Sequence, residues 1–266
     1  MSRSGLVPRD GGRRLLTKVP EITIYFWIVK LLTTAMGEST SDYLVVHMNP
    51  YVAVVLVFVG FVAALLLQFS LRTYVAWAYW LLVVMVAVFG TMVADVIHIV
   101  FGVPYFISTI SFAIILTGVF LSWYQVERTL SIHSVNTRRR ELFYWATVLA
   151  TFALGTAAGD MTASTFHLGY LPSGILFTGL FLLAGVGYAL FRRNPIFAFW
   201  FAYVMTRPLG ASFADWFGKP KNITGLGYGD GIVASLLTIL IVIFVSYLSI
   251  SRKDVQNENV AMTMEG

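Results

Sequence analysis

The sequence contains no cysteine and has few charged residues. Of its 266 residues, 12% are Asp, Glu, Lys or Arg, whereas 58% are hydrophobic. The absence of cysteine excludes disulfides, thiolate metal ligands and cysteine nucleophiles. A soluble domain carries charge on about a quarter of its residues. The low charge and the high hydrophobic content therefore indicate an integral membrane protein.

The common sequence motifs of enzymes are also absent. No HExxH, G-x-S-x-G, P-loop or dinucleotide-binding fingerprint occurs in a suitable context. We therefore expect neither an enzymatic activity nor a bound cofactor. The net charge of +5 comes from Lys and Arg residues that lie almost entirely between the hydrophobic runs. We interpret this charge as a signal of membrane topology and expect no nucleic-acid partner.

Eight hydrophobic runs are long enough to cross a bilayer as helices, which takes about 20 residues each. The sequence therefore predicts an all-α integral membrane protein with eight transmembrane helices, in contact with membrane lipid. The runs are Ile22–Leu44, Tyr51–Leu71, Tyr74–Phe101, Tyr105–Val126, Leu142–Phe166, Ile175–Leu190, Ile196–Phe217 and Gly231–Ile250.

The basic residues between these runs predict the orientation of the chain. With the N-terminus inside, fourteen Lys and Arg residues fall on the cytoplasmic side, and two, Lys219 and Lys221, fall outside. This positive-inside bias predicts that both termini are cytoplasmic. Residues Leu6–Arg9 match a thrombin-type recognition tetrapeptide and are either a tag remnant or native sequence.

One pattern recurs four times: an aromatic–Trp pair, nine residues, Gly, four residues and Asp. Each copy lies in an odd-numbered run, so the sequence predicts four parallel helical hairpins with a pseudo-symmetry axis along the membrane normal. We divide the chain into a basic N-terminal segment (1–18), two membrane halves (19–130 and 131–251) and a cytoplasmic tail (252–266). The repeated residues are Trp27, Gly37, Asp42; Trp80, Gly90, Asp95; Trp145, Gly155, Asp160; and Trp200, Gly210, Asp215.

The four aspartates are candidate ligands of a metal ion. Each lies fifteen residues, or about 22 Å of helix, beyond its tryptophan, so all four are expected at similar depth toward the outer face. The residue after each repeat glycine precedes its Asp by four and shares its helix face. Glu38, Thr91 and Thr156 offer oxygen at that position, and His98 follows Asp95 by three residues. Oxygen ligands of this kind suit hard divalent cations.

A structural role for the same residues is the alternative. An intramembrane Asp can cap a helix or bond a neighbouring helix, and a repeat glycine can serve close packing alone. For the four tryptophans we favour packing or anchoring at the membrane interface.

Two basic residues lie inside predicted spans and are candidate counter-charges. Lys30 begins a polar stripe that continues through Thr34, Glu38 and Asp42 at intervals of four residues. It is expected either to pair with an acid, to serve as a fixed charge that a cation or proton releases, or to reach the interface. Arg207 is expected to pair with an intramembrane carboxylate, with Asp42 or Asp160 as the candidates.

Several blocks of the chain resemble a known family. KVPEITIYFWIVKLLTTAMGESTSDYL, RRRELFYWATVLATFALGTAAGD and FWFAYVMTRPLGASFADW resemble bacterial multi-pass inner-membrane proteins built of tandem repeats of unknown function, often described as predicted membrane-anchored proteins. The resemblance covers about residues 18 to 250 and implies the bacterial inner membrane as the location. Gly159-Asp160-Met161-Thr162 is similar to part of the E-x-G-D-[KR]-[ST] motif of cation/proton exchangers, but the Glu and the basic residue are missing.

These observations lead to one functional hypothesis and two alternatives. We expect a transporter of small cations, with a divalent metal such as manganese as the substrate bound at the intramembrane acids. The alternatives are a scaffold or sensor subunit with structural acids and a cation channel. A homo-oligomer is compatible with each of them.

Overall fold

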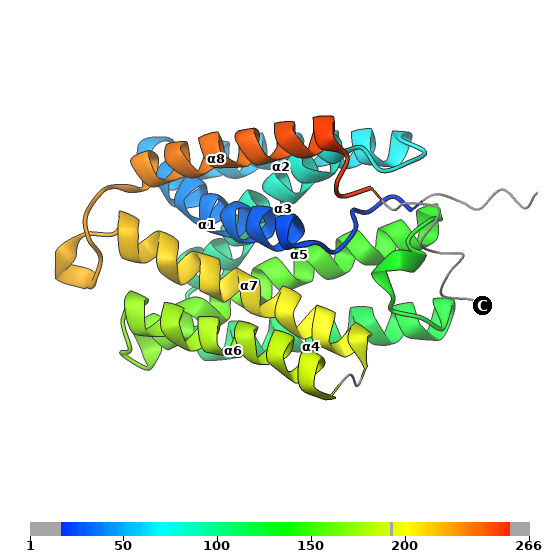
Figure 1. Cartoon of the computed structure of the whole chain (residues 1–266). Coiled ribbons are helices and arrows are strands. Elements are labelled where there is room, and N and C mark those ends of the chain that lie inside the picture. Colours follow the sequence, from blue (N-terminus) through cyan, green and yellow to red (C-terminus); the bar gives the residue numbers. More distant parts are fainter. Residues whose placement is uncertain (1–16, 192–193, 256–266) are drawn as a thin grey trace, which may run out of the picture.

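The computed structural model of the protein describes residues 17–191 and 194–255, which form a bundle of eight α helices (Figure 1). The expected basic segment up to residue 16, Leu6–Arg9 and the end of the C-terminal tail lie outside the described residues. The helices are α1 (Ile24–His47), α2 (Pro50–Ser70), α3 (Ala76–Asp95), α4 (Tyr105–Glu127), α5 (Arg138–Asp160), α6 (Tyr170–Phe191), α7 (Pro195–Gly218) and α8 (Asp230–Ser251).

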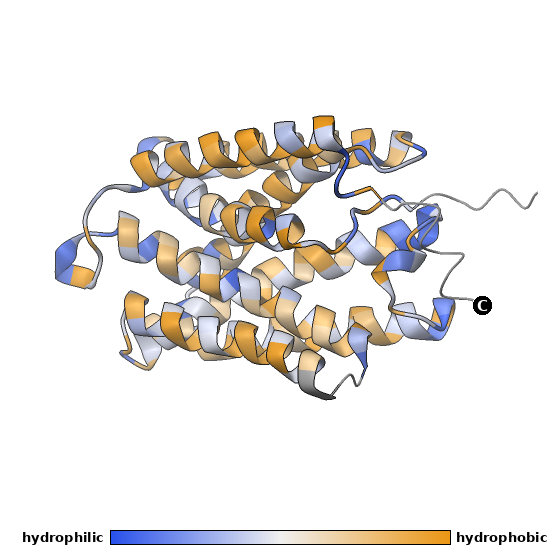
Figure 2. Ribbon diagram, in the orientation of Figure 1, coloured by the Kyte–Doolittle hydropathy of each residue, from blue (hydrophilic) through white to orange (hydrophobic). Residues whose placement is uncertain are grey.

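Six of these helices are long and apolar enough to cross a membrane, namely α2, α3, α4, α5, α6 and α8. The chain is therefore compatible with a multi-pass membrane protein, and hydrophobic residues occur along all eight helices (Figure 2). Helices α1 and α7 were expected to be spans as well but are too polar to meet the same standard. They contain Lys30, Glu38 and Asp42, and Arg207 and Asp215, respectively.

The four odd-numbered helices form the interior of the bundle. Contacts join α1 to α3, α3 to α5, α5 to α7 and α7 back to α1. Within the most apolar stretch of each helix, 56% of the residues are buried in α3 and 67% in α5. In each even-numbered helix the corresponding share is 22%. Three even-numbered helices pack mainly on the odd-numbered helix that follows them in the chain, α2 on α3, α4 on α5 and α6 on α7, whereas the last helix, α8, packs mainly on α1. Helix α8 therefore completes the outer layer against the start of the chain.

The repeat glycines lie at the four contacts of this inner ring. A Cβ atom added to Gly37 would lie 2.5 Å from the Ala87 Cβ, and one added to Gly90 would lie 2.7 Å from the Phe152 Cβ. Such distances are too short for any side chain, so these glycines permit the helices to approach closely. The contacts around the ring are Gly37 with Ala87, Gly90 with Phe152, Gly155 with Arg207, and Gly210 with Thr34.

Two helices begin clearly earlier than predicted: α6 begins at Tyr170, five residues before Ile175, and α5 begins four residues before Leu142. Helix α5 begins at Arg138, four residues early, because the Thr137 side chain accepts a hydrogen bond from the Arg140 backbone N–H and caps the helix. The arginine triplet is therefore the first turn of α5 rather than part of a loop. Directly after Asp95 and Asp160, α3 and α5 continue as π-helical turns over Val96–Val100 and Met161–Thr165. The α1 and α7 aspartates are followed by ordinary helix.

The two described ends of the chain meet at one end of the bundle, where the Glu21 N–H donates to the Asp254 carbonyl at 2.8 Å. Just before α1, the Lys18 ammonium donates to Glu141 at 2.6 Å, and Gln68 donates to the other oxygen of Glu141 at 3.0 Å. The Glu141 side chain is fully buried. These bonds attach the segment before α1 to α2 and α5.

Candidate functional site

The guanidinium of Arg207 lies at the centre of the inner ring and contacts the other three odd-numbered helices. Its Nη2 atom donates to Glu38 on α1 at 2.5 Å, to Thr156 on α5 at 2.7 Å, and to Thr91 on α3. Arg207 has no exposed surface, and Glu38 is 3% exposed. The partner of Arg207 is thus Glu38, and the expected pairing with Asp42 or Asp160 was wrong. Glu38 lies one helical turn before Asp42 on α1 and has a longer side chain than aspartate, and its carboxylate contacts the Arg207 guanidinium.

The three acceptors of Arg207 occupy the same position in three repeats, directly after the repeat glycine. The Thr91 and Thr156 hydroxyls donate to carbonyls four residues earlier in their own helices, at 2.9 and 3.1 Å. Each hydroxyl therefore uses its proton within its helix and presents a lone pair to the guanidinium. The fourth repeat has Ala211 at this position, which supplies no oxygen. Equivalent positions of three repeats thus supply oxygen atoms to one point, where the Arg207 Nη2 atom lies.

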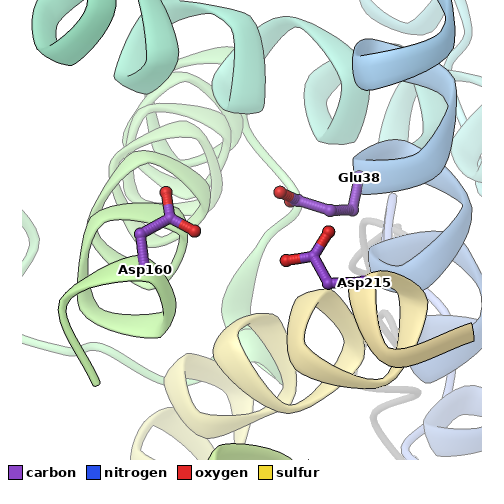
Figure 3. Close-up of side chains that lie close together, drawn as sticks. All are labelled: Glu38, Asp160 and Asp215. Atoms are coloured by element: carbon purple, nitrogen blue, oxygen red, sulfur yellow. The ribbon is translucent and has the colours of Figure 1, made fainter. Parts of the chain in front are cut away.

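Three carboxylates converge next to Arg207. Glu38, Asp160 and Asp215 each offer an oxygen atom, and these atoms all lie within 4.8 Å of one another. Figure 3 shows the three side chains reaching toward a common point from α1, α5 and α7. Asp215 is 4% exposed, and its Oδ1 atom is buried without a hydrogen-bond partner among the described residues. Carboxylates this close repel one another unless a cation or protons lie between them.

Lys219, directly after α7, lies among the remaining acids at this end of the bundle. Its ammonium donates to Asp42 at 2.6 Å and lies 3.8 Å from Asp230 and 4.0 Å from Asp215. Burial alone would lower the pKa of Lys219, but the charges of Asp42 and Asp215 outweigh burial and raise this pKa well above its usual value. Lys219 therefore stays positively charged throughout the physiological pH range.

Asp95 and His98 are not members of the group of three carboxylates. Asp95 contacts the Ser41 hydroxyl at 3.5 Å. The His98 ring stacks on Tyr105, with 3.5 Å between centroids, and its Nδ1 atom lies 2.8 Å from the Val103 carbonyl oxygen. His98 sits in the π-helical turn after Asp95, so the two side chains do not share one ordinary helix face. Their assignment as metal ligands stays a prediction, as it does for Asp42 and the three clustered acids.

Lys30 lies two turns before Glu38 on α1 and is 1% exposed. Its ammonium lies between two aromatic rings, 4.0 Å from the centroid of Phe152 and 4.1 Å from that of Tyr203. Among the described residues, Nζ has no hydrogen-bond partner. Of the expected roles, neither pairing with an acid nor reaching the interface fits this position, and aromatic faces replace a carboxylate as its neighbours.

The repeat tryptophans of α3, α5 and α7 belong to the hydrophobic core. Trp80, Trp145 and Trp200 are 1%, 4% and 5% exposed, and the Trp200 indole N–H donates to the Leu130 carbonyl at 2.9 Å. Trp27 is partly buried and packs against the same core. Packing was one of the two expected roles, and it is the one seen for the three buried tryptophans.

Sequence reasoning missed two parts of this site. It did not join Arg207 to Glu38, Thr91 and Thr156, although their common repeat position was already visible. It also left Lys219 as an outer loop residue, although Lys219 follows Asp215 by four residues, the spacing of helical ion pairs. The Lys18, Gln68 and Glu141 contacts carry no signal in the sequence, because these residues are 50 or more positions apart.

The inner ring of helices, its repeat glycines and its central polar residues define a helical membrane protein built from four tandem repeats. The family described as Repeat of Unknown Function (DUF347) matches this chain over four consecutive segments, residues 25–74, 78–129, 143–194 and 198–254. The chain therefore belongs to this family, which confirms the resemblance to a repeat-built family. Each segment begins beside an aromatic–Trp pair and contains one odd-numbered and one even-numbered helix.

Comparisons with curated proteins and with solved structures give no match.

Proposed function

We propose that this protein transports small cations across a membrane, with a divalent metal such as manganese as the substrate. The observation that carries the proposal is the convergence of Glu38, Asp160 and Asp215 from three helices, with oxygen atoms within 4.8 Å of one another. Carboxylate oxygens are the ligands that hard divalent cations such as Mn²⁺ prefer. The buried Asp215 Oδ1 atom, which lacks a hydrogen-bond partner among the described residues, is the acceptor that a bound cation would satisfy.

The balance of charge supports a cation site over a purely structural role. Arg207 pairs with Glu38, and Lys219 pairs with Asp42 and lies 4.0 Å from the Asp215 Oδ1 atom. Asp160 has no ion pair with a described basic residue, although it faces two other carboxylates. Acids inside membrane helices are costly and usually mark an ion or proton pathway. A divalent cation between Asp160 and Asp215 would remove this imbalance.

The remaining acids at this end of the bundle fit the approach to the site. Asp42 and Asp230 contact the Lys219 ammonium, which is partly exposed. We infer that Asp42 and Asp95 attract cations from the outer side and that Glu38, Asp160 and Asp215 bind them. His98 would complete a ligand set only if its ring turned away from the Val103 carbonyl.

The proposed orientation follows from chain charge. Both described ends lie at the same end of the bundle, as an even number of crossings requires. The bias of Lys and Arg toward that end favours a cytoplasmic location for both termini. We place the protein in a bacterial inner membrane, with the four repeats parallel around an axis along the membrane normal. Contacts from three repeats to one Arg207 atom support such an axis.

Single substitutions in purified protein test this function. We expect Asp160→Asn and Asp215→Asn to weaken Mn²⁺ binding, measured by calorimetry, by about 10–100-fold or more, because each removes a charged ligand. Uptake of Mn²⁺ into proteoliposomes should fall with it. Asp230→Asn is the matched control: it is another aspartate near Lys219, but it lies outside the group of three, so binding should persist. Unchanged binding in both site variants would refute the proposal.

A scaffold or sensor subunit is the second candidate, favoured by the bonds from Arg207 to three helices. In that case the acids hold the ring of helices together. The Asp160→Asn and Asp215→Asn variants would then have lower melting temperatures, and the wild type would bind no metal. Melting curves recorded with and without Mn²⁺ separate the two functions, because a ligand that binds only the folded state raises the melting temperature.

A further inference from the structure

We propose that Arg207 is a tethered cation that occupies the inner half of the metal site and must leave Glu38 before the substrate binds there. This inference rests on the proposed function and deepens it. It makes Arg207 the residue that selects divalent over monovalent cations. It also provides a means of release, because the guanidinium can return to Glu38 when the metal departs.

The contacts of the Arg207 guanidinium come from three different repeats. Its Nη2 atom is surrounded by oxygens from three repeats at one equivalent position, Glu38, Thr91 and Thr156. A carboxylate and two hydroxyls around one point are oxygen ligands of the kind that a hard cation takes. Glu38 also belongs to the group with Asp160 and Asp215. The guanidinium and a metal ion would therefore compete for the same carboxylate.

The hydrogen-bond donors of Arg207 are only partly satisfied in this position. Its Nε and Nη1 atoms are buried and have no hydrogen-bond partner among the described residues. A guanidinium has five N–H donors, and leaving several of them unpaired in a protein interior is unfavourable. The Arg207 guanidinium and the Lys30 ammonium also both lie near the Phe152 ring, at 5.4 and 4.0 Å from its centroid. Two like charges near one ring repel. This position is therefore one from which Arg207 can be displaced.

The charge of the incoming ion decides whether it can replace the guanidinium at Glu38. A monovalent ion that replaces the guanidinium at Glu38 exchanges one positive charge for another and gains little. A divalent ion brings one more positive charge to Glu38, Asp160 and Asp215 than the guanidinium does, and this additional attraction is strong in a medium of low dielectric constant. The tethered charge thus sets a threshold that favours divalent ions.

The test is Mn²⁺ binding to full-length Arg207→Gln, measured by calorimetry with and without K⁺. If the guanidinium occupies Glu38 about nine-tenths of the time, its removal tightens the apparent affinity for Mn²⁺ about tenfold. K⁺ should compete with Mn²⁺ in this variant and not in the wild type. In the control, Glu38→Gln together with Arg207→Gln, the gain in affinity should disappear because the released carboxylate is missing. Unchanged or weaker binding by folded Arg207→Gln would overturn the proposal.

A second variant covers the case in which Arg207→Gln does not fold. Thr91→Val with Thr156→Val keeps the side-chain shapes and introduces no unpaired charge, but it removes two acceptors that hold the guanidinium. Displacement then becomes easier, and Mn²⁺ affinity should rise several-fold; an unchanged affinity would count against the tethered cation. The outcomes for the two proposals differ. Loss of Mn²⁺ binding in Asp160→Asn with no effect at Arg207 leaves the proposed function standing, whereas a wild type that binds no divalent cation removes both.

Discussion

Gly155 on α5 lies directly against the side chain of Arg207 on α7. A Cβ atom at position 155 would overlap with the Cβ and Cγ atoms of Arg207 and lie 3.0 Å from Cδ of Pro208. The glycine of the third repeat thus leaves the space through which the arginine of the fourth repeat reaches the ring centre. The ion pair of Arg207 and Glu38 therefore depends on the absence of a side chain at position 155.

Gly155→Ala should therefore destabilise the protein. Overpacking of this kind costs about 1–3 kcal/mol, and the displaced Arg207 would also lose contacts. We expect a lower melting temperature and, if Glu38 is released, a changed Mn²⁺ affinity. Gly118→Ala is the matched control, because nothing lies within 4 Å of a Cβ at that position. An equal melting temperature for Gly155→Ala and Gly118→Ala would contradict the close contact.

Lys30→Met should stabilise the protein. The Lys30 ammonium is buried without a hydrogen-bond partner among the described residues, which costs several kcal/mol. Its contacts with Phe152 and Tyr203 return only about 2 kcal/mol. Methionine fills a similar volume without the charge, so the melting temperature should rise. Lys30→Gln keeps a polar group without an acceptor and should be less stable than Lys30→Met. A lower melting temperature for Lys30→Met than for the wild type would show that the two rings satisfy the charge.

The ion pair of Lys18 and Glu141 predicts a non-additive pair of substitutions. Both side chains are buried, and removing one member of such a pair costs about 3–5 kcal/mol because the other charge loses its partner. Lys18→Met and Glu141→Gln should each lower stability in a denaturation experiment, and the double variant should lose less than the two single losses combined. Additive losses would mean that the 2.6 Å contact contributes no coupling energy.

The absence of cysteine permits a direct test of orientation. Lys221→Cys and Arg138→Cys each place one thiol at an exposed position, at opposite ends of the bundle in the proposed orientation. A membrane-impermeant maleimide should label Lys221→Cys in intact spheroplasts and Arg138→Cys only after permeabilisation. The reverse labelling pattern would place the termini outside.

The sequence predicted much of the fold because its signals are local. Long apolar runs gave the eight helices, and the spacing of Trp, Gly and Asp gave the four repeats. Helix boundaries were less accurate at α5, where the Thr137 cap extends the helix to Arg138. The π-helical turns after Asp95 and Asp160 were not predicted, because each spans only five residues, too short a stretch to show a different periodicity in an apolar run.

By itself, the sequence determined which residues of the four repeats are equivalent, because the spacing of Trp, Gly and Asp is the same in each copy. It placed Glu38, Thr91 and Thr156 at one repeat position without indicating what lies between them. Only the tertiary structure decided that Arg207 bonds to Glu38, that Lys30 faces Phe152 and Tyr203, and that Asp160 and Asp215 converge with Glu38 in a group that does not include Asp95. The physical reason is that such neighbours depend on which helices adjoin and how closely their glycines let them approach. Those distances join residues that lie far apart in the chain.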